Sequence, residues 1–396
     1  MRKNKKILFF PFDLLSHYSR SIMLANSIKE QYEVQILYSE KYNDLYDALK
    51  ISSFQCLSFD AEMILQHAKK FSFNWIQEDY LETIFLDQVR VIKELKPDLI
   101  IGDAIWTLKM AAEYCGVLYC SVINAYMSSY YKEVRGLPLN HPAYQYKEKL
   151  PGKVFDFITK TAEGWAFRKY HTPFRTIRKK RGLKTKRKLM EELDGDITLI
   201  CDHQNLFPVK KTPSSFYNIG PLYYESDTSA EIEVQVVKRK TILICMGSSG
   251  DFQKLEILKD PILKGFIFII ITGKEDPGFG ENFIVHKFLN LHKVLPLVDL
   301  MICHGGNGTI YYALKHKVPV LAMPSHFEQE WNMQQLIKFE LGDIITEKES
   351  AVSIKNKIDY WIKQRNSSTN NFEIDLESSL KLFQHILDKQ MDVINP

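Results

Sequence analysis

Most of the residues whose types and spacing could support chemistry lie in one segment of the second half, 299–332, which reads DLMICHGGNGTIYYALKHKVPVLAMPSHFEQEWN. Its pattern predicts a strand, a glycine-rich turn, a helix, a second strand and a polar turn. Gly305, Gly306 and Gly308 allow backbone N–H groups to approach a ligand closely, and the following helix directs the positive end of its dipole at the same point. The turn therefore predicts an anion site, although it is neither a Walker loop, because GKS or GKT is missing, nor a GxGxxG fingerprint.

A second glycine-rich turn, in CMGSSGDF at 245–252, follows another predicted strand of the same half. Two such turns at the carboxyl ends of parallel strands suit a diphosphate. Either turn alone fits a tight chain connection equally well, and Glu328 alone fits a solvated residue in the first turn of a helix. The combination of His304, Glu328 and Gln329 at neighbouring strand ends favours a binding site.

A second pair of candidate residues lies in the first half. His17 follows the first predicted strand in PFDLLSHYS, and Asp103 ends another strand in PDLIIGD. An imidazole can act as a general base near neutral pH. A single histidine at the start of a helix is more often a cap or a surface residue, but Asp103 at a neighbouring strand end favours a functional pair, because sites in parallel sheets gather there.

Continuous apolar runs alternate with helix-period segments in both halves, which predicts parallel sheets covered on both faces. The expected fold class is α/β, with two facing Rossmann-like doubly wound domains and a cleft between them. A polar stretch at 220–240 is the expected linker. The expected strands are 6–12, 34–38, 97–103, 117–123, 196–202, 241–247, 265–273, 297–303 and 318–324, and the expected helices are 17–31, 106–115, one after 304, one from 327 and one from 376.

The composition excludes several classes of protein. Of 396 residues, 45% are hydrophobic and 25% are charged, which excludes a mainly disordered chain. The net charge of +4 and the lack of a recognised motif argue against nucleic-acid binding. Six irregularly spaced cysteines indicate a reducing compartment. The apolar run after MRKNKK is too short for a signal peptide, and no run reaches the ~18 residues of a membrane span, so a cytoplasmic location is expected.

HGGNGT followed by VPVLAMPSHFEQEWN resembles the donor-site signature of the UDP-glycosyltransferase family, whose members have the GT-B fold and include plant, macrolide and glycolipid glucosyltransferases. KILFFPF…SHYS, PDLIIGD, NIGPL and MGSSG match this family in order. The resemblance covers most of the chain and is weakest at 40–90 and 130–195. It implies an N-terminal acceptor domain at 1–225, a C-terminal donor domain at 226–375, and a final helix at 376–396 that packs back on the N-terminal domain.

The resemblance implies a nucleotide-sugar site in the second half. His304 would hydrogen-bond the β-phosphate, and the backbone at Gly308 and Thr309 would hold the diphosphate. Glu328 and Gln329 match the acidic-glutamine pair that grips the sugar hydroxyls. The donor-binding residues implied in this way are Ser248, Phe288, Leu289, His304, Gly306, Asn307, Gly308, Thr309, Glu328 and Gln329.

The resemblance also implies the chemistry. His17 would take the proton from an acceptor hydroxyl as that oxygen attacks the anomeric carbon, and Asp103 would orient the imidazole and stabilise its charged form. The reaction is a single displacement with inversion that moves a hexose, by default glucose, to a small lipidic or aromatic acceptor. No metal or other cofactor is expected, since His304, the loop amides and the helix dipole can neutralise the departing diphosphate. The aromatic residues expected to line the acceptor site, or merely to pack, are Tyr126, Tyr130 and Trp165.

Three positions depart from the family pattern. Tyr312 stands where the family often has an acidic residue that binds ribose hydroxyls, and Asn290-Leu291 replaces a Pro-Gln beside the base. Ser16 replaces the common glycine before the histidine. Phe288 could still stack on a base. UDP is the default nucleotide, and deoxythymidine diphosphate (dTDP), which lacks the ribose 2′-hydroxyl, is the alternative.

The segment 147–188 carries 15 Lys and Arg against three acidic residues, a local net charge of +12. Val154, Phe157, Trp165 and other apolar residues alternate with these charges, so its helices have an apolar face. One interpretation is a solvated basic surface over a buried face. The other is peripheral contact with an anionic membrane or an anionic acceptor.

Two rival functions are compatible with the same scaffold. A nucleotide-sugar epimerase shares the two-domain architecture, but the SHYS and FEQ matches favour transfer. A degenerate scaffold that acts as a binding or regulatory partner would explain Tyr312 and Leu291. The presence of His17, Asp103 and His304 argues against that second rival.

Overall fold

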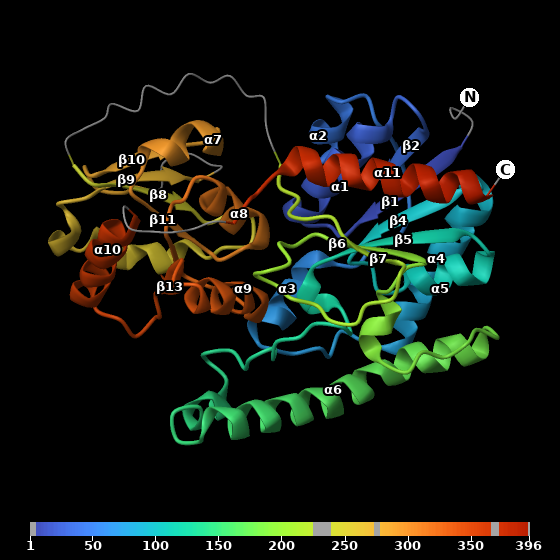
Figure 1. Cartoon of the computed structure of the whole chain (residues 1–396), viewed down its shortest axis with the longest axis horizontal. Helices are drawn as coiled ribbons and strands as arrows, with labels where there is room; N and C mark the ends of the chain where they lie inside the picture. Colours follow the sequence, from blue (N-terminus) through green and yellow to red (C-terminus); the bar gives the residue numbers. More distant parts are fainter. Residues whose placement is uncertain (1–4, 225–238, 273–277, 366–371, 395–396) are drawn as a thin grey trace. The chain divides into compact units, whose positions relative to one another are not determined.

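The chain divides into two compact units, each built around one parallel sheet (Figure 1). The first unit contains Met1–Tyr224 and Asp375–Pro396, and the second contains Glu225–Ile374. The predicted α/β class with two Rossmann-like sheets is confirmed, whereas most of the expected linker at 220–240 lies outside the described residues. The computed structural model describes residues 5–224, 239–272, 278–365 and 372–394.

Seven parallel strands form the sheet of the first unit, in the order β3-β2-β1-β4-β5-β6-β7. Their residues are mostly buried on both faces, because helices cover the sheet on either side. The order makes β1 and β4 neighbours, so the chain segments that follow them meet at the same sheet edge. The strands are β1 (Lys6–Pro11), β2 (Glu33–Leu37), β3 (Ser52–Phe54), β4 (Leu99–Asp103), β5 (Leu118–Ile123), β6 (Ile197–Ile200) and β7 (Phe216–Asn218).

The helices of the first unit lie on both faces of this sheet (Figure 1). Helices α4, α5 and α6 pack on one another over one face, and α1 packs with α11. Tyr32 Oη donates to Asp388 Oδ1 of α11 at 2.8 Å, and Gln384 Nε2 of α11 donates to the Ser27 carbonyl at 2.5 Å. The helices are α1 (Leu15–Ile28), α2 (Asn43–Asp47), α3 (Ala61–Lys69), α4 (Glu78–Leu95), α5 (Leu108–Cys115), α6 (Gly152–Lys180) and α11 (Leu376–Ile394).

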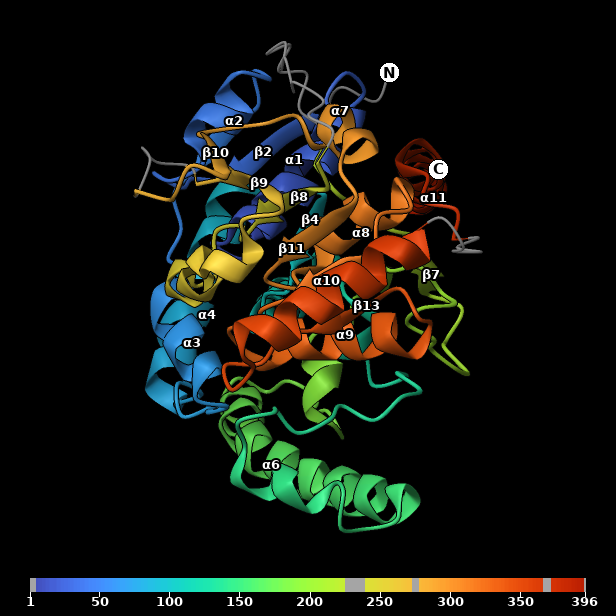
Figure 2. The same ribbon diagram turned by 90° about the vertical axis from the view of Figure 1, so that its left-hand side faces the viewer.

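Six parallel strands form the sheet of the second unit, in the order β10-β9-β8-β11-β12-β13. The two strands that precede the glycine-rich turns, β8 and β11, are neighbours in the sheet. Cys245 and Cys303 lie opposite each other in the strand register at their carboxyl ends. Helix α10 packs against β11, and α9 packs against β13 (Figure 2). The elements are β8 (Thr241–Cys245), β9 (Ile267–Ile271), β10 (Phe283–His286), β11 (Leu300–Cys303), β12 (Val320–Ala322), β13 (Gly342–Ile344), α7 (Leu291–Val294), α8 (Asn307–Lys315), α9 (Phe327–Lys338) and α10 (Ala351–Arg365).

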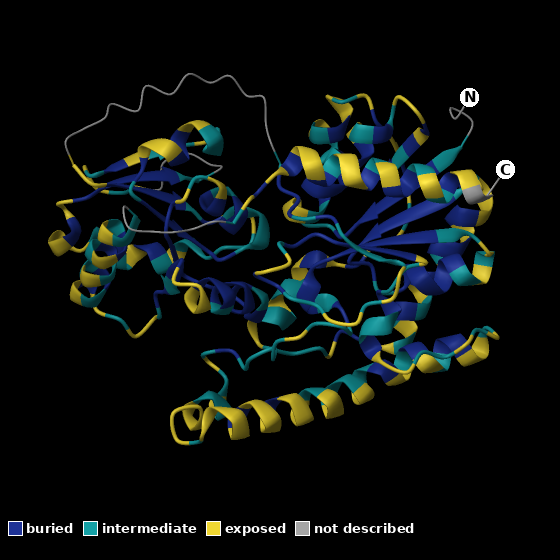
Figure 3. Ribbon diagram, in the orientation of Figure 1, coloured by how far each residue is buried: buried dark blue, intermediate teal, exposed yellow. Residues whose placement is uncertain are grey.

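Burial follows these layers: the central strands of both sheets are buried, and exposed residues lie on the outer helices and loops (Figure 3). The four strands that the sequence pattern did not predict, β3, β7, β10 and β13, are three or four residues long and include the outermost strands of both sheets. Within the described ranges, no helix is long and apolar enough to cross a bilayer.

Candidate functional site

Adjacent strand ends bring His17 and Asp103 together in the first unit. Pro11, the last residue of β1, pairs in register with Asp103, the last residue of β4. The chain then enters α1, and its first turn carries His17. His17 Nδ1 lies 2.7 Å from Asp103 Oδ1, and the Asp103 side chain is fully buried. Because the carboxylate accepts, Nδ1 carries the proton and Nε2 is left as the basic nitrogen of the ring.

Arg20 is a third member of this cluster that the sequence analysis missed. Its Nε donates to Asp103 Oδ2 and its Nη2 to Asp103 Oδ1, both at 2.5 Å, and Nη2 lies 3.0 Å from His17 Nδ1. Arg20 and His17 are three residues apart on α1, which places both on one face of the helix. This spacing alone does not identify Arg20 in the sequence, because its carboxylate partner is 83 residues away.

The cluster extends to the ends of the next two strands. Arg20 Nη1 donates to Asn124 Oδ1 at 3.0 Å, just after β5. The Asp202 carboxylate, which follows β6, accepts from Asn124 Nδ2 at 3.3 Å and from the Ala125 N–H at 2.6 Å. Groups that follow β1, β4, β5 and β6 are therefore held in one hydrogen-bonded network at the carboxyl edge of the sheet.

Electrostatics in this network favour a charged carboxylate. Burial raises the pKa of Asp103. The neighbouring Arg20, and to a smaller extent His17, lower it by more than burial raises it, so the net pKa lies below the usual value. Burial lowers the pKa of the Arg20 guanidinium, but Asp103 more than offsets this, and the net pKa is raised. The pair is thus a charged guanidinium-carboxylate contact in a buried setting, and it fixes the oxygen that holds His17.

In the second unit, His304 follows β11, and its ring lies close to the backbone of two glycines from different turns. A Cβ on Gly306 would come within 2.2 Å of His304 Nε2, and a Cβ on Gly247, after β8, would come within 2.6 Å of Cε1. Only glycine therefore allows both turns to approach the ring. Burial lowers the pKa of His304 to about 4, so its imidazole is neutral at pH 7 and acts as a hydrogen-bonding group, not as a cation.

The start of α8 lies directly after these glycines. Gly305 has φ of +84°, and Gly306 is the N-cap and provides no side-chain cap. Asn307, Gly308 and Thr309 form the first turn and are half-buried. A helix N-terminus beside a glycine turn favours a phosphate group.

The side chain of Gln329 makes hydrogen bonds within the protein itself. Its Oε1 accepts from the Ser325 N–H at 2.6 Å, and its Nε2 donates to Ser249 Oγ at 3.1 Å. The Gln329 side chain thus ties the turn before α9 to the turn after β8. Glu328 beside it is half-buried. Ser249, which the sequence analysis did not single out, holds this tie, whereas Ser248 is exposed.

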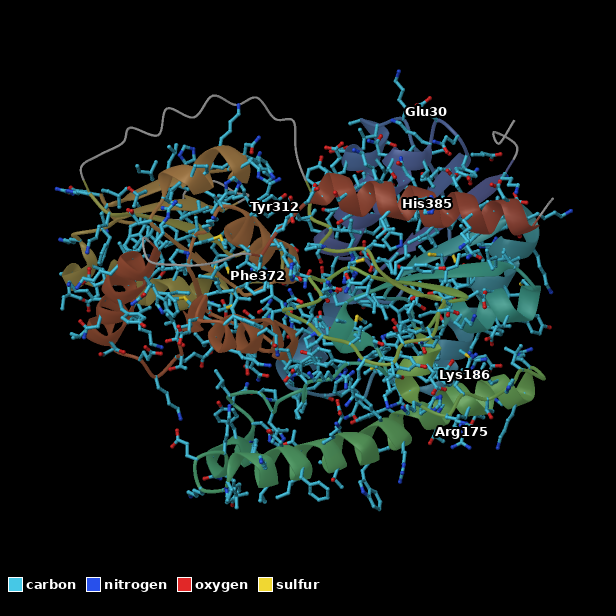
Figure 4. All side chains as sticks on the ribbon, viewed as in Figure 1. Glu30, Arg175, Lys186, Tyr312, Phe372 and His385 are labelled. Carbon is cyan, nitrogen blue, oxygen red and sulfur yellow. The ribbon has the colours of Figure 1, made fainter. Side chains whose placement is uncertain are left out.

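The predicted base-binding residues lie around α7. Phe288 is 70% exposed, Leu289 is half-buried, and Asn290 is the N-cap of α7, where its side chain accepts from the His292 N–H at 3.0 Å. This cap is a physical reason for asparagine at a position where the family has proline. Tyr312, labelled in Figure 4, lies on α8 with its ring 5.1 Å from that of His292.

The three predicted acceptor residues have different surroundings. Tyr126 is buried in a 3₁₀ turn, Ala125–Met127, close enough to Arg20 to affect its pKa. The Tyr130 ring contacts that of Phe216 at 5.1 Å. Trp165 is 70% exposed on α6, and no contact joins it to His17 or Asp103. In the part of the chain that the structure describes, no three His, Cys, Asp or Glu side chains cluster as metal ligands.

Comparison with known proteins identifies the family of the second unit. Residues 231–386 match the model of the glycosyltransferase family 28 C-terminal domain, which covers both glycine-rich turns. Residues 231–386 therefore form a glycosyltransferase family 28 C-terminal domain, and the chain as a whole has the GT-B fold. The family expectation from HGGNGT and its neighbouring motifs is therefore confirmed, while the sugar, the nucleotide and the acceptor of this glycosyltransferase are not fixed by the match.

Relatives and solved structures cover most of this glycosyltransferase. The PGL/p-HBAD biosynthesis glycosyltransferase of Mycobacterium tuberculosis is 24% identical over 342 residues, 84% of this chain and 78% of the relative. The structure of CalG4, the calicheamicin glycosyltransferase, has a TM-score of 0.70 at 14% identity and covers 100% of both chains. The spinosyn rhamnosyltransferase SpnG, solved with thymidine diphosphate, has a TM-score of 0.62 at 15% identity and covers 97% of this chain and 96% of its own.

Proposed function

We propose that this glycosyltransferase moves a sugar from a nucleoside diphosphate to a hydroxyl of a small apolar acceptor in one displacement with inversion. The observation that carries the proposal is the 2.7 Å contact between His17 Nδ1 and Asp103 Oδ1 at paired strand ends. This contact leaves Nε2 of His17 to accept the proton of the acceptor hydroxyl. Asp103 then stabilises the imidazolium that forms, in the manner of a histidine-carboxylate pair in other enzymes.

The second unit supplies the donor end of the reaction. His304 is neutral and offers a hydrogen bond to the departing diphosphate, and the first turn of α8 directs its N–H groups and dipole toward an anion. The glycines at 247 and 306 allow the backbone to approach the His304 ring closely. In this proposal, these groups and not a metal ion neutralise the leaving group.

The preferred nucleotide in this proposal is dTDP, with UDP as the alternative. Tyr312 occupies the position where an acidic residue would bind ribose hydroxyls, and its ring contacts His292. A tyrosine at that position removes a carboxylate acceptor for the 2′-hydroxyl, which dTDP lacks. The thymidine diphosphate bound to the spinosyn rhamnosyltransferase supports the same choice and extends the sugar class to 6-deoxyhexoses.

Calorimetric titration with dTDP, UDP and GDP, in buffer that contains EDTA, tests the donor half of the proposal. We expect dTDP to bind most tightly and His304→Ala to weaken its binding. His385→Ala, at an exposed position on α11, is the matched control and should bind like the wild type. Equal binding of all three nucleotides, or binding that requires a divalent metal, would contradict the donor assignment.

Turnover of His17→Ala tests the catalytic half. With dTDP-rhamnose or UDP-glucose and a panel of phenols and apolar alcohols, this variant should lose about 10²–10⁴-fold in turnover, because the base is removed. Its nucleotide affinity should be unchanged, since His17 and His304 lie in different units. Near-normal turnover in His17→Ala would remove the role of base. A wild-type protein that binds nucleotide but transfers no sugar would favour the degenerate scaffold.

A further inference from the structure

Helix α6 has an inner face that attaches it to the first unit. It is 29 residues long, and its buried residues are concentrated toward its C-terminal end, where it packs against α4. The helix runs along the outside of its unit (Figures 1 and 2), and Figure 3 shows most of its surface as exposed. The buried residues of α6 are Phe155, Thr159, His171, Phe174, Ile177 and Arg178.

The opposite face of α6 carries an exposed apolar stripe. Val154, Phe157, Ile158 and Trp165 are 45%, 73%, 49% and 70% exposed. Their spacing of three, four and eleven residues from Val154 places them on one side of the helix, over about 16 Å of its length. Phe157 and Trp165 are therefore large apolar side chains that the protein itself leaves in water, which indicates an interaction surface.

The basic residues of segment 147–188 fall into two groups in the structure: some form ion pairs with carboxylates, and others do not. At the attached end, carboxylates from outside the segment neutralise much of it: Lys180 pairs with Glu78, and Arg181 pairs with Glu82 at 2.6 Å. The local net charge of +12 thus overstates what is uncompensated there. The basic residues of α6 that have no ion pair with any described residue are Lys153, Lys160, Arg168, Lys169, Lys179 and Arg175, the last labelled in Figure 4.

The two acidic residues of α6, Asp156 and Glu163, do not lie on the apolar stripe. Glu163 is half-buried and pairs with Arg135 at 2.9 Å. Asp156 lies two positions after Val154, and helical geometry therefore turns it toward the opposite side. Lys153 lies four positions before Phe157 and Lys160 three positions after it, while Arg168 and Lys169 lie three and four positions after Trp165. These four basic residues therefore border an apolar stripe that carries no acidic side chain, and their alkyl stems can extend along it while their charges remain in water.

We propose that this outer face of α6 docks the protein on an anionic phospholipid membrane. A helix with apolar side chains on one line and lysines or arginines beside it lies in the interfacial plane of such a membrane, with aromatic rings at headgroup depth. Each basic residue near the surface adds attraction to anionic lipids. Pairing of the same face with a second copy is disfavoured, because the uncompensated positive charges of both copies would meet.

Vesicle cosedimentation of the full-length protein tests the proposal without donor or acceptor, so its outcome does not depend on the transfer reaction. Vesicles of equal parts phosphatidylglycerol and phosphatidylcholine should bind the wild type, and pure phosphatidylcholine should bind it much more weakly. High salt should release the protein from the anionic vesicles, because it screens the basic residues. Absence of binding to the anionic vesicles would overturn the proposal.

Two double variants separate the apolar and the charged contributions. Phe157→Ser with Ile158→Ser should abolish sedimentation, while Val352→Ser with Tyr360→Ser, which removes two exposed apolar side chains from α10, should not. Lys153→Ser with Lys160→Ser should weaken binding about 25-fold, because each basic residue near the surface contributes a factor of about five. Lys348→Ser with Lys363→Ser is its control, since both lysines are exposed in the other unit and the net charge falls equally.

Trp165 provides a direct reading of contact with lipid. Brominated acyl chains should quench the part of the fluorescence that Trp165→Phe removes, and circular dichroism should show that every variant is folded. Equal sedimentation of the Phe157/Ile158 variant and its control would overturn the proposal. So would light scattering that shows a wild-type dimer which becomes a monomer in that variant, because the stripe would then be a contact between copies.

Discussion

Arg20 donates to both carboxylate oxygens of Asp103, and the oxygen that accepts from Nη2, Oδ1, also accepts from His17 Nδ1. One buried carboxylate therefore serves a structural partner and a proposed catalytic one at once. Because the two Arg20 contacts are in a fork, they fix the plane of the carboxylate as well as its position. Arg20 is thus a positioning residue for the pair in which His17 acts.

Removal of the Arg20 charge should destabilise the protein. Arg20→Met leaves Asp103 buried without its main cationic partner, and we expect a loss of about 3–5 kcal/mol in the free energy of unfolding. The double variant Arg20→Met with Asp103→Asn removes both charges and should recover a large part of that loss. Urea unfolding of the wild type, the single variants and the double variant measures the difference.

Turnover of the same variants separates stability from catalysis. The double variant should remain at least about 100-fold slower than the wild type, because an asparagine amide cannot stabilise the imidazolium of His17. Recovery of both stability and turnover in the double variant would show that Asp103 is a structural residue only. If Arg20→Met were as stable as the wild type, the buried ion pair would not carry the role given to it here.

An added methyl group at Gly306 should displace His304. Gly306 has φ of −67°, which alanine adopts without strain, so the effect of Gly306→Ala comes from the contact of its Cβ with His304 Nε2. We expect nucleoside diphosphate affinity to fall at least tenfold, about 1.4 kcal/mol. Calorimetric titration with the best-binding nucleotide measures the change.

Gly265→Ala is the matched control for this substitution. Gly265 lies in the same unit, and nothing lies within 4 Å of the Cβ that alanine would add. Its nucleotide affinity should equal that of the wild type. Unchanged affinity in Gly306→Ala would indicate that the His304 ring does not contact the bound nucleotide.

Sequence patterns predicted the parts of the fold that depend on long apolar runs. β1, β4, β5, β8 and β11 lie within the expected ranges, because continuous burial leaves a clear signal. β3, β7 and β13 have three residues each, and a run that short has no distinctive period. The proximity of His17 and Asp103 was accessible because it follows from which strand ends each residue adjoins.

Other features depend on which distant residues meet, and a local pattern does not contain that information. Arg20 was missed because a single arginine in a helix is usually solvated, and its partner is 83 residues away. The neutralisation of Lys180 by Glu78, 102 residues apart, is of the same kind. Gln329 could be placed near the donor turn, but its hydrogen bond to Ser249 joins residues that are 80 positions apart in the sequence.

We expect a half-buried carboxyl group shortly after segment 147–188 to make the stability of the first unit depend on pH. Asp194 follows a 3₁₀ turn, Leu189–Glu192, and its Oδ1 is buried without a hydrogen-bond partner among the described residues. Burial first, and the charge of Glu191 second, raise the pKa of Asp194 to about 7. In the unfolded chain the pKa of an aspartate is about 3.9.

The sign of the effect follows from these two values. Between about pH 4 and pH 7 the folded state binds more protons than the unfolded state, so the free energy of unfolding falls as pH rises through this window. Asp194→Asn cannot ionise and should be more stable than the wild type at pH 8, by about 1–3 kcal/mol. At pH 4.5, where the Asp194 carboxyl is protonated in the folded protein, the advantage should largely disappear.

Urea unfolding at pH 4.5, 6 and 8 tests this expectation, with Asp196→Asn as the control. Asp196 Oδ1 accepts from Lys109 Nζ at 2.6 Å, and Oδ2 accepts from the Tyr119 N–H at 3.0 Å. Its substitution should therefore destabilise the protein at pH 8, opposite in sign to Asp194→Asn, because it removes a charge that is paired. If Asp194→Asn were no more stable than the wild type at pH 8, Asp194 would be ionised in the folded protein without cost, and the raised pKa would be wrong.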